Sequence, residues 1–387
     1  MTLINTQSEL DSFCQKISSS PYILVDTEFL RDKTYYPQLC LIQLSAPSVD
    51  AVAIDPLAEK LSLDPVWDLM KNENIIKVFH AARQDLEIIF YHTGKVPTPI
   101  FDTQIAAMVC DFGDNVAYNV LVEKITGTYL KKNAQFTDWS KRPLSTKQMQ
   151  YAIDDVVYLN DVYLHLDRLL KEKDRIHWVK QEMAILESHK TYENNPEDSW
   201  KRIKIRSDSA ETLMILKELA AWREQSAKDR NVPRSRVIKD ESLADIALYC
   251  PQNKKGLSRI RNLSKDYTNG NKGDHILTLI EKAKNTPKDQ WPKRERKKTL
   301  PKSASAILEM LKLLLKINAV EAGIVPKLIA NNEDLIALAR DNDHTILAMQ
   351  GWRDEIFGKD ARELIAGNMS IGVHKGKIKK FYQTKTA

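Results

Sequence analysis

Short apolar runs separated by turn residues fill the first part of the chain. A helix is predicted over 8–17, and the alternation that follows, bounded by Pro, Ser and Asp, predicts a series of strands. A second helix over 57–70 precedes the last strand, and the pattern is helical from there to about residue 190. The predicted strands are 22–26, 39–45, 51–55 and 75–80. Successive strands followed by a strand and helix alternation predict a mixed sheet flanked by helices.

Two acids with one residue between them lie at the end of the first predicted strand. In the run 22–29, Asp26 and Glu28 point to the same face of an extended strand, while Thr27 points to the other. Two carboxylates this close are unfavourable unless a proton or a cation lies between them, and an all-oxygen ligand set suits hard divalent metals. A polar, solvated strand end would also account for these acids, so this segment alone leaves both interpretations open.

A second acid follows the strand predicted over 75–80. Apolar side chains at helical spacing from Leu86 to Phe90 place Asp85 in the first turn of a helix. An acid at that position also stabilises a helix by interacting with the positive end of its dipole. His80 is a candidate ligand or base, although a histidine at a strand end commonly makes a structural hydrogen bond.

A third candidate lies on a helix predicted to begin at Ser145 and to continue to about residue 172. Ser145 is expected to cap this helix, with a glutamine at the capping-box position three residues later. Tyr151 and Asp155 are four residues apart and therefore share one helical face. Asp154 is also one turn from Tyr151, and the spacing alone does not choose between the two aspartates.

Together these elements resemble the three exonuclease motifs of the DEDD superfamily. The motifs are Asp-x-Glu on a strand, an acid opening a helix within His-x-x-x-x-Asp, and Tyr-x-x-x-Asp on a later helix. The tyrosine subtype is indicated, because Tyr151 stands four positions before Asp155 and Gln150 occupies the position where the other subtype has histidine. Closer similarity to the ribonuclease D family is carried by residues 24–30, 39–43, 138–144 and 151–155.

The resemblance implies a ribonuclease H-like mixed-sheet exonuclease domain over residues 1–195. It also implies a metal-dependent 3′-5′ exoribonuclease that releases 5′-mononucleotides from RNA 3′ ends, with precursor tRNA and other small structured RNAs as substrates. A single-strand DNA 3′-5′ exonuclease uses the same four acids, and a non-catalytic RNA-binding scaffold would retain the basic helical modules. All four acids are present and no polymerase-like region accompanies them, which favours the exoribonuclease.

Two divalent cations would let these acids cleave a phosphodiester bond. One cation lowers the pKa of its bound water, and the other meets the leaving oxygen. We expect Asp26 to bridge both ions, Glu28 and Asp155 to complete the first site, and Asp85 to hold the second, directly or through water. Mg²⁺ or Mn²⁺ suits these oxygen ligands. Tyr151, a phenol with an ordinary pKa of about 10, is expected to orient the attacking water rather than to remove its proton.

Contacts with substrate are predicted from less specific patterns. The segment 137–144 carries an aromatic ring and two cations, which suit stacking on a base and pairing with phosphates, although a packed loop has the same composition. Phe29 would point to the face opposite Glu28 unless the strand bends there. Gln43 and Asn119 are expected to make ordinary buried hydrogen bonds. The predicted substrate contacts are Phe29, His80, Trp139, Arg142, Lys254, Lys255 and Arg259.

The chain after a boundary within 192–208 is predicted to be helical. Its first part resembles an HRDC domain over 208–288, which implies nucleic-acid binding. A basic, proline-punctuated stretch over 285–301 then leads to a divergent second copy over 300–375. The helices predicted in the two copies are 210–227, one capped by Asp240 or Ser242, 256–260 and 275–280, and then 307–317 and 331–339.

Composition is consistent with these expectations. The 387 residues carry a net charge of +6, which favours a polyanionic partner such as RNA. Four cysteines without Cys-x-x-Cys spacing predict neither a zinc cage nor a disulfide framework. Because the start of the chain lacks a signal-like apolar segment and no apolar run is long enough to span a bilayer, we expect a cytoplasmic monomer with no membrane partner.

Overall fold

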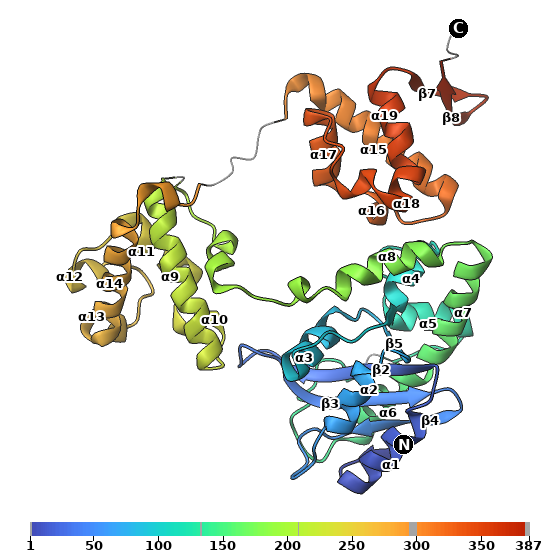
Figure 1. Cartoon of the computed structure of the whole chain (residues 1–387), viewed down its shortest axis with the longest axis horizontal. Coiled ribbons are helices and arrows are strands. Elements are labelled where there is room, and N and C mark those ends of the chain that lie inside the picture. Colours follow the sequence, from blue (N-terminus) through green and yellow to red (C-terminus); the bar gives the residue numbers. More distant parts are fainter. Residues whose placement is uncertain (1, 132–133, 208, 294–299, 384–387) are drawn as a thin grey trace.

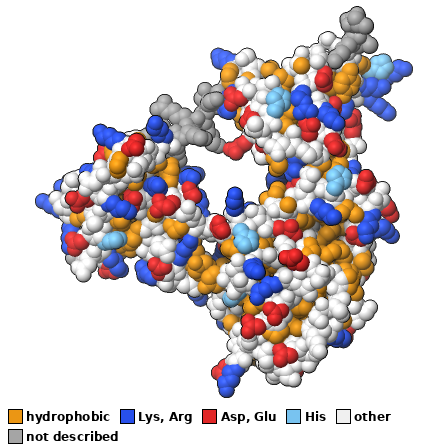
Figure 2. All heavy atoms as spheres, in the orientation of Figure 1, with side chains coloured by type: hydrophobic (Ala, Val, Ile, Leu, Met, Phe, Trp, Pro, Cys, Tyr) orange, Lys and Arg blue, Asp and Glu red, His pale blue; other side chains and the backbone are white. Residues whose placement is uncertain are grey.

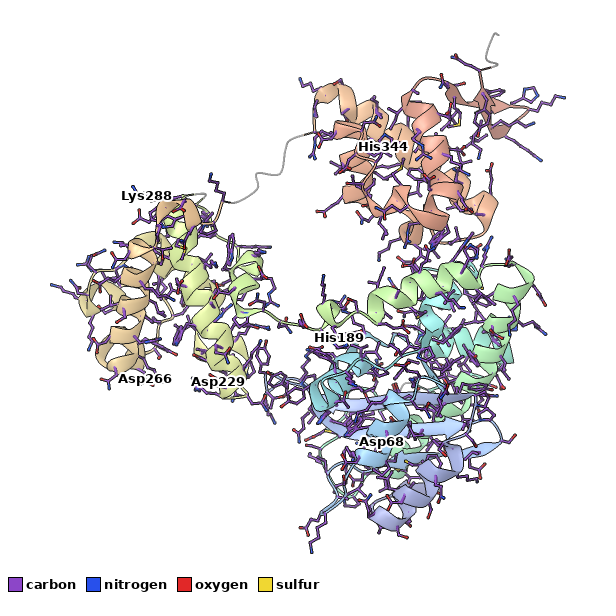
Figure 3. All side chains as sticks on the ribbon, in the orientation of Figure 1. Asp68, His189, Asp229, Asp266, Lys288 and His344 are labelled. Atoms are coloured by element: carbon purple, nitrogen blue, oxygen red, sulfur yellow. The ribbon has the colours of Figure 1, made fainter. Side chains whose placement is uncertain are left out.

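The computed structural model describes residues 2–131, 134–207, 209–293 and 300–383 (Figure 1). Three parts follow one another along the chain: an N-terminal domain that ends with helix α8, a middle module of helices, and a C-terminal module. His189, labelled in Figure 3, lies on the segment that joins the first two parts. Residue 208, at which the middle domain is predicted to begin, and residues 294–299 of the predicted linker lie outside the described residues.

A six-stranded mixed sheet forms the N-terminal domain, in the order β1-β4-β3-β2-β5-β6. β2, β3 and β4 are antiparallel neighbours as predicted, whereas β1, β5 and β6 pair in parallel. β1 and β6 are not predicted, because three residues are too few to show an alternating pattern. The strands are β1 (Thr2–Ile4), β2 (Tyr22–Leu30), β3 (Gln38–Ala46), β4 (Val49–Ile54), β5 (Ile76–Phe79) and β6 (Ile100–Asp102). The helices are α1 (Gln7–Ile17), α2 (Asp64–Lys71), α3 (Arg83–Thr93), α4 (Thr103–Val109), α5 (Tyr118–Thr126), α6 (Thr146–Val157), α7 (Leu159–Glu172) and α8 (Ile176–Leu186).

Strand β2 is internal and covered on both faces, which explains its continuous apolar run. Ile23 and Val25 pack in the large core that contains residues of α1, α2 and α3, while Leu24 packs against α6 and α7. The strand continues through Asp26 to Leu30, so the two acids do not mark its end as predicted. They project instead from an internal strand, on the face that α6 covers.

Two helices differ from the prediction. Residues 57–63, expected to be helical, form turns and irregular structure, because the Asp55 side chain accepts a hydrogen bond from the backbone N–H of Leu57 at 2.9 Å. The long helix predicted to begin at Ser145 divides at Tyr158 into α6 and α7. As a result, α6 packs against β2, β3 and β4, while α7 packs against α4 and α5.

The middle module encloses a separate apolar core around its first helix. Its helices are α9 (Ala210–Asp229), α10 (Arg234–Val237), α11 (Asp240–Tyr249), α12 (Lys254–Leu257), α13 (Lys265–Asn269) and α14 (Asn271–Asn285). The predicted caps of α11 are wrong, because Lys239 is its N-cap residue. Asp240 pairs with the buried Arg223 at 2.5 Å, and the buried Ser242 donates to the carbonyl of Arg261 at 2.9 Å.

The loop between β2 and β3 attaches the middle module to the N-terminal domain. The side-chain oxygen of Asn231 accepts hydrogen bonds from the backbone N–H groups of Tyr35 and Tyr36, both at 3.1 Å. The hydroxyl of Tyr35 donates to Glu224, which also accepts two hydrogen bonds from Arg234. The ring of Tyr36 stacks on a tyrosine of α3 with the ring centroids 3.9 Å apart. The segment that follows the two acids of β2 is therefore held by side chains of the middle module.

The C-terminal module shares one continuous apolar core with the N-terminal domain. Trp178 of α8 stacks on Trp352 with the ring centroids 4.7 Å apart, and Arg353 pairs with Glu182 of α8 at 2.5 Å. Arg175 donates hydrogen bonds to backbone carbonyls at the ends of α4 and α15. The elements are α15 (Lys302–Ala322), α16 (Pro326–Ile329), α17 (Asn332–Asp341), α18 (Gly351–Arg353), α19 (Lys359–Ile365), β7 (Met369–His374) and β8 (Lys377–Tyr382).

The hairpin β7–β8 extends the C-terminal module beyond residue 375, where the domain is predicted to end. The space-filling view shows an opening between the three parts of the chain (Figure 2). Among the residues that the structure describes, no helix has the length and apolar character that crossing a membrane requires.

We predict that breaking the pair between Glu182 and Arg353 destabilises the junction between the N-terminal domain and the C-terminal module. Both side chains are buried, with exposed fractions of 6% and 4%. Arg353→Met leaves a buried carboxylate without its cation, which costs about 3–5 kcal/mol of unfolding free energy. Denaturant unfolding followed by tryptophan fluorescence measures this loss, because the stacked Trp178 and Trp352 adjoin the pair.

The double variant Glu182→Leu with Arg353→Met should lose less stability than Arg353→Met alone, because no charge is left buried. Lys312→Met, which breaks an exposed pair with Glu309 on α15, is the control and should cost at most about 1 kcal/mol. Equal losses for Arg353→Met and Lys312→Met would contradict the assignment of this pair to a buried junction.

Candidate active site

Three carboxylates meet on the face of the sheet that α6 covers. Asp26 and Glu28 project from β2 and Asp155 projects from α6, and one oxygen of each lies within 4.8 Å of the other two. They line a cavity of about 510 Å³. Asp85 and Tyr151 line the same cavity. The structure therefore brings together the five residues predicted to be catalytic.

Helix α6 begins with the predicted capping box. The Ser145 hydroxyl accepts a hydrogen bond from the backbone N–H of Gln148 at 3.2 Å, and the Gln148 side chain accepts one from the backbone N–H of Ser145 at 3.0 Å. Further along, Ala152 and Ile153 pack with residues of β3 and β4. Capping fixes where the helix starts and packing fixes its rotation, and together they direct Asp155 into the cavity.

Asp85 reaches the cavity from the first turn of α3. The turn before α3 is held by Asp102 at the end of β6, which accepts hydrogen bonds from the backbone N–H groups of Ala81 and Ala82 at 3.0 and 2.9 Å. Ala81 has a φ of 59°, a conformation that residues other than glycine rarely adopt, so Asp102 stabilises a strained turn. Thr27, on the other face of β2 as predicted, donates a hydrogen bond to Asp85.

Burial and mutual repulsion raise the pKa values of these acids. Burial and then the charges of Asp26, Asp155 and Asp85 raise the pKa of Glu28 to about 10. Burial followed by the charge of Asp155 raises the pKa of Asp26, and burial followed by the charge of Asp26 raises the pKa of Asp85. The charges that act on Glu28 come from further carboxylates, so each member of the group opposes ionisation of the others.

This set of donors fits a divalent cation of the hard class. The carboxylates offer only oxygen atoms, and those of Asp26, Glu28 and Asp155 are close enough together to bind a single ion. A cation between them would replace the repulsion that raises their pKa values with attraction. Asp85 lines the same cavity and is 6% exposed. The group has the chemistry of an acidic metal-binding cluster.

Two phenols adjoin the acids. Burial, and after it the charge of Asp155, raises the pKa of Tyr151 well above its ordinary value, and the Tyr151 hydroxyl is hydrogen-bonded to Asp155. Burial and the charge of Asp155 likewise raise the pKa of Tyr118, whose hydroxyl donates to the backbone carbonyl of Asp154 at 3.1 Å. Both phenols therefore keep their protons near neutral pH. The side chain of Asp154 accepts a hydrogen bond from Gln150 at 2.8 Å, so Asp155, not Asp154, joins the carboxylate group.

Three predicted substrate contacts are engaged inside the protein instead. Trp139 is 1% exposed and packs between β3 and α6, so its ring is not available to stack on a base. Arg142 is held by Asp55 through two contacts of 2.6 Å. His80 lines the cavity, but both its ring nitrogens lie at hydrogen-bonding distance, 3.0 and 3.1 Å, from other protein groups. The segment 137–144, whose aromatic and cationic residues suggest a binding loop, is a packed loop in the structure.

The remaining predicted contacts lie in different places. The pairing of β2 with β3 shifts between Glu28 and Phe29, and this irregularity lets both residues line the cavity. In the middle module, Lys254 pairs with an aspartate of α14 at 2.8 Å, Lys255 is exposed, and Arg259 lines a separate groove. Contact of these three cations with RNA stays a prediction.

Gln43 and Asn119 do not make the ordinary hydrogen bonds expected of them. Gln43 is fully buried directly opposite Asp26 in the sheet, and neither atom of its amide group has a partner among the described residues. Asn119 lines the cavity, and its buried side-chain oxygen also has no hydrogen-bond partner among the described residues. Unpartnered amides beside the acids mark a region built for something other than packing alone.

The cavity also includes side chains that the sequence does not single out. Phe136 lines it while being 95% exposed, Lys131 adds positive charge, and Arg31 lines it while paired with Glu87 at 2.5 Å. Gln84 and Gln104 complete its polar wall. None of these belongs to a spacing motif. The one available signal is that Phe136 directly precedes the segment selected for its aromatic and cationic residues.

Comparison with known proteins follows the same division of the chain. A family model described as a 3′-5′ exonuclease matches residues 1–171, and a model of the HRDC domain matches residues 212–280. The first model contains all the acids of the cavity, and the second falls within the middle module.

Two relatives that are both named ribonuclease D match nearly the whole chain. A ribonuclease D of Nitrobacter hamburgensis is 43% identical over 378 residues, which is 98% of this chain and 98% of that protein. A ribonuclease D of Jannaschia sp. is 44% identical over 379 residues, covering 97% of this chain and 98% of that protein. The similarity thus includes the C-terminal module, which neither family model matches.

A solved structure also matches nearly the whole chain. The crystal structure of Escherichia coli RNase D, described as an exoribonuclease involved in structured RNA processing, superimposes with a TM-score of 0.82 at 28% identity. The match covers 95% of this chain and 98% of that one, so it includes all three parts of the molecule.

We predict that the acid cluster destabilises the metal-free protein as the pH rises. A carboxyl group whose pKa is raised by folding binds its proton more tightly in the folded state, so its contribution is complete below the unfolded pKa of about 4.3. That contribution is lost as the pH rises toward about 10 for Glu28. Glu28→Gln removes the ionisation, so in chelator the variant should melt above wild type, and the gap should widen from about pH 5.5 to about pH 8.5.

Added Mg²⁺ should raise the melting temperature of wild type more than that of Glu28→Gln, because the cation replaces the repulsion. Glu123→Gln on the exposed side of α5 is the matched control and should show no pH-dependent gap. A gap of the same size at both pH values would contradict the coupling described for Glu28.

Proposed function

This chain belongs to the ribonuclease D family of 3′-5′ exoribonucleases, and we propose that Asp26, Glu28, Asp85, Asp155 and Tyr151 form the centre that releases 5′-mononucleotides from the 3′ ends of its RNA substrates. The observation that carries this assignment is the meeting of carboxylates from β2 and α6 in one cavity with Asp85. Structured RNAs, precursor tRNAs among them, are the proposed substrates, in line with the described role of the E. coli protein.

We propose that the acids hold two divalent ions, Mg²⁺ or Mn²⁺. Asp26 would contact both ions, because one of its carboxylate oxygens lies within 4.8 Å of Glu28 and Asp155 and its charge also raises the pKa of Asp85. Glu28 and Asp155 complete one site and Asp85 the other. Bound there, such ions lower the pKa of water and stabilise charge on the attacking and leaving oxygens.

Tyr151 is assigned to orienting the attacking water. Its raised pKa keeps the phenol protonated, so it does not serve as the base. The hydroxyl is hydrogen-bonded to Asp155, and as a donor in that bond it retains a lone pair that can accept a hydrogen from water. The water would thereby be aligned between the phenol and the carboxylates.

The cavity wall supports binding of a single-stranded 3′ end. Phe136 offers an exposed aromatic face at the cavity and Lys131 offers a charge for phosphates, while Arg31 would have to exchange its pair with Glu87 for a phosphate. We propose these three, with Phe29, as the nearest substrate contacts. The cations Lys254, Lys255 and Arg259 of the HRDC domain are proposed as more distant phosphate contacts.

The proposed organisation is an exonuclease domain over 1–195, an HRDC domain over 208–288 and a second, divergent HRDC-like domain over 300–375 that the β7–β8 hairpin extends. We propose that the protein acts as a monomer and that it works in the cytoplasm, where a reducing environment would keep its four cysteines free.

We predict that Asp155→Asn abolishes cleavage while Asp154→Asn does not. Asp155 belongs to the carboxylate group, whereas the Asp154 side chain is engaged by Gln150. The assay follows a 5′-labelled RNA hairpin with a single-stranded 3′ tail in Mg²⁺, with a matched DNA and a circular RNA beside it. Wild type should shorten the linear RNA stepwise and leave the circle intact, and the rate of Asp155→Asn should fall by at least about 10³-fold.

Asp154→Asn should stay within about fivefold of wild type, a change of about 1 kcal/mol in activation free energy, because the Asp154 side chain is held by Gln150 and does not join the carboxylate group. Equal losses in the two variants would contradict the assignment of Asp155. Cleavage of the circle, or faster cleavage of the DNA than of the RNA, would contradict an exoribonuclease.

A separate prediction concerns the phenol. Tyr151→Phe should lower kcat by about 10²-fold with little change in KM, because water positioning matters in the transition state more than in binding. Tyr118→Phe is the matched control, since its hydroxyl donates to a backbone carbonyl rather than to an acid of the cluster. Undiminished kcat in Tyr151→Phe would remove this residue from the mechanism.

A further inference from the structure

The hairpin β7–β8 is an antiparallel ribbon with two chemically different faces. Residues directly opposite each other across an antiparallel pair share a face, so the register assigns every side chain. One face carries Met369, Ile371, Val373, Ile378, Lys380 and Tyr382, and the other carries Ser370, Gly372, His374, Lys377, Lys379 and Phe381.

The first face attaches the ribbon to the C-terminal module at the end away from the turn, whereas Val373 and Ile378 near the turn are 74% and 50% exposed. Met369 is 3% exposed, and Lys380 pairs with Glu321 at 2.7 Å and with Asp360 at 3.1 Å. The hydroxyl of Tyr382 donates to the same Asp360 at 2.8 Å. The single lysine of this face is therefore neutralised, and the ribbon is fixed in place by buried and charged contacts.

The second face combines an aromatic ring with positive charge. Phe381 is 44% exposed, and its ring lies over Gly372, where a Cβ would come within 3.1 Å of the ring. Glycine at that position lets the ring lie close to the ribbon with a face open to solvent. Lys377 and Lys379 extend the same face as a row along β8. The result is an exposed ring at one end of a line of cations.

The turn of the hairpin adds a further cation. Lys375 and Gly376 both have positive φ, 50° and 73°, as in the two-residue turns that match the twist of a ribbon. In the part of the chain that the structure describes, no acid pairs with Lys375, Lys377 or Lys379, in contrast to Lys380. In Figure 2, basic side chains gather where Figure 1 places the hairpin, away from the junction with the N-terminal domain.

We propose that this second face is an RNA-binding site separate from the active site, at which Lys375, Lys377 and Lys379 contact phosphates and Phe381 stacks on an unpaired base. Aromatic rings combined with a line of cations are what unpaired nucleotides require, and neutralisation of phosphates supplies affinity without sequence preference. This proposal rests on the proposed function in one respect, namely that the bound polyanion is RNA. It would hold the body of a structured RNA while the 3′ end lies among the acids.

The experiment compares three full-length proteins that all carry Asp155→Asn, so that RNA is bound without being cut. One has no further change, the second carries Lys375→Gln, Lys377→Gln and Lys379→Gln, and the third is a control with three other exposed lysines of the same module changed. The control substitutions are Lys302→Gln, Lys316→Gln and Lys359→Gln. The second and third proteins have the same net charge, so any difference between them reports position.

Fluorescence anisotropy with a labelled hairpin RNA that carries a 3′ tail gives Kd as a function of salt. The ribbon variant should bind about tenfold more weakly, and the slope of log Kd against log salt should fall by about two to three, since each lost phosphate contact removes about 0.7–0.9. A fourth protein, which carries Phe381→Leu together with Asp155→Asn, should bind more weakly with the slope unchanged, because stacking releases no counterions. The lysine control should match the protein with Asp155→Asn alone.

A ribbon variant that matches the lysine control in both Kd and slope would overturn the proposal. So would retention of RNA binding together with loss of binding to vesicles containing phosphatidylserine, which would assign the ribbon to an anionic membrane surface. Cleavage of a short oligonucleotide by the ribbon variant in the background with Asp155 intact should equal that of wild type. Failure of wild type itself to cleave that oligonucleotide would count against the proposed function and not against the ribbon.

Discussion

Repulsion among acidic side chains is the constraint on which the rest of this structure depends. Asp26, Glu28, Asp85 and Asp155 come from three separate elements. The charges of the other three raise the pKa of Glu28, the charge of Asp155 raises that of Asp26, and the charge of Asp26 raises that of Asp85. No isolated strand or helix would hold them together against that repulsion. The internal position of β2, the capped and packed helix α6, and the turn fixed by Asp102 supply the restraint. The repulsion lowers the stability of the metal-free protein, and a bound cation would relieve it.

The two helical modules relate to this site in different ways. The C-terminal module continues the core of the N-terminal domain, and the stacked Trp178 and Trp352 lie in the middle of that junction. The middle module has its own core and is attached through the loop after β2, where Tyr35 meets Glu224. That loop begins where Arg31 lines the cavity, so one segment contacts both the middle module and the cavity that holds the acids.

The meeting of the acids in one cavity could be predicted because local rules place them. The period of two in a strand puts Asp26 and Glu28 on one face, and helical spacing with a capping signal orients Asp155. Trp139 was predicted wrongly because an aromatic residue among cations looks the same in a binding loop and in a packed one. The support that Asp102 gives to Asp85 could not be predicted, since it depends on a three-residue strand and on contacts across the sheet. The β7–β8 ribbon is not predicted, because lysines interrupt the apolar alternation of β8 and glycine and histidine weaken the strand signal of β7.

The most direct test of this account is diffraction from crystals grown with Mn²⁺, measured at the manganese absorption edge. Anomalous peaks for two ions are predicted inside the cavity, in contact with Asp26, Glu28, Asp85 and Asp155, and crystals of the variant Asp26→Asn should show weakened peaks there. A cavity without manganese while the ion binds elsewhere on the protein, or full occupancy in the Asp26→Asn crystals, would contradict the claim that these four carboxylates exist to bind metal.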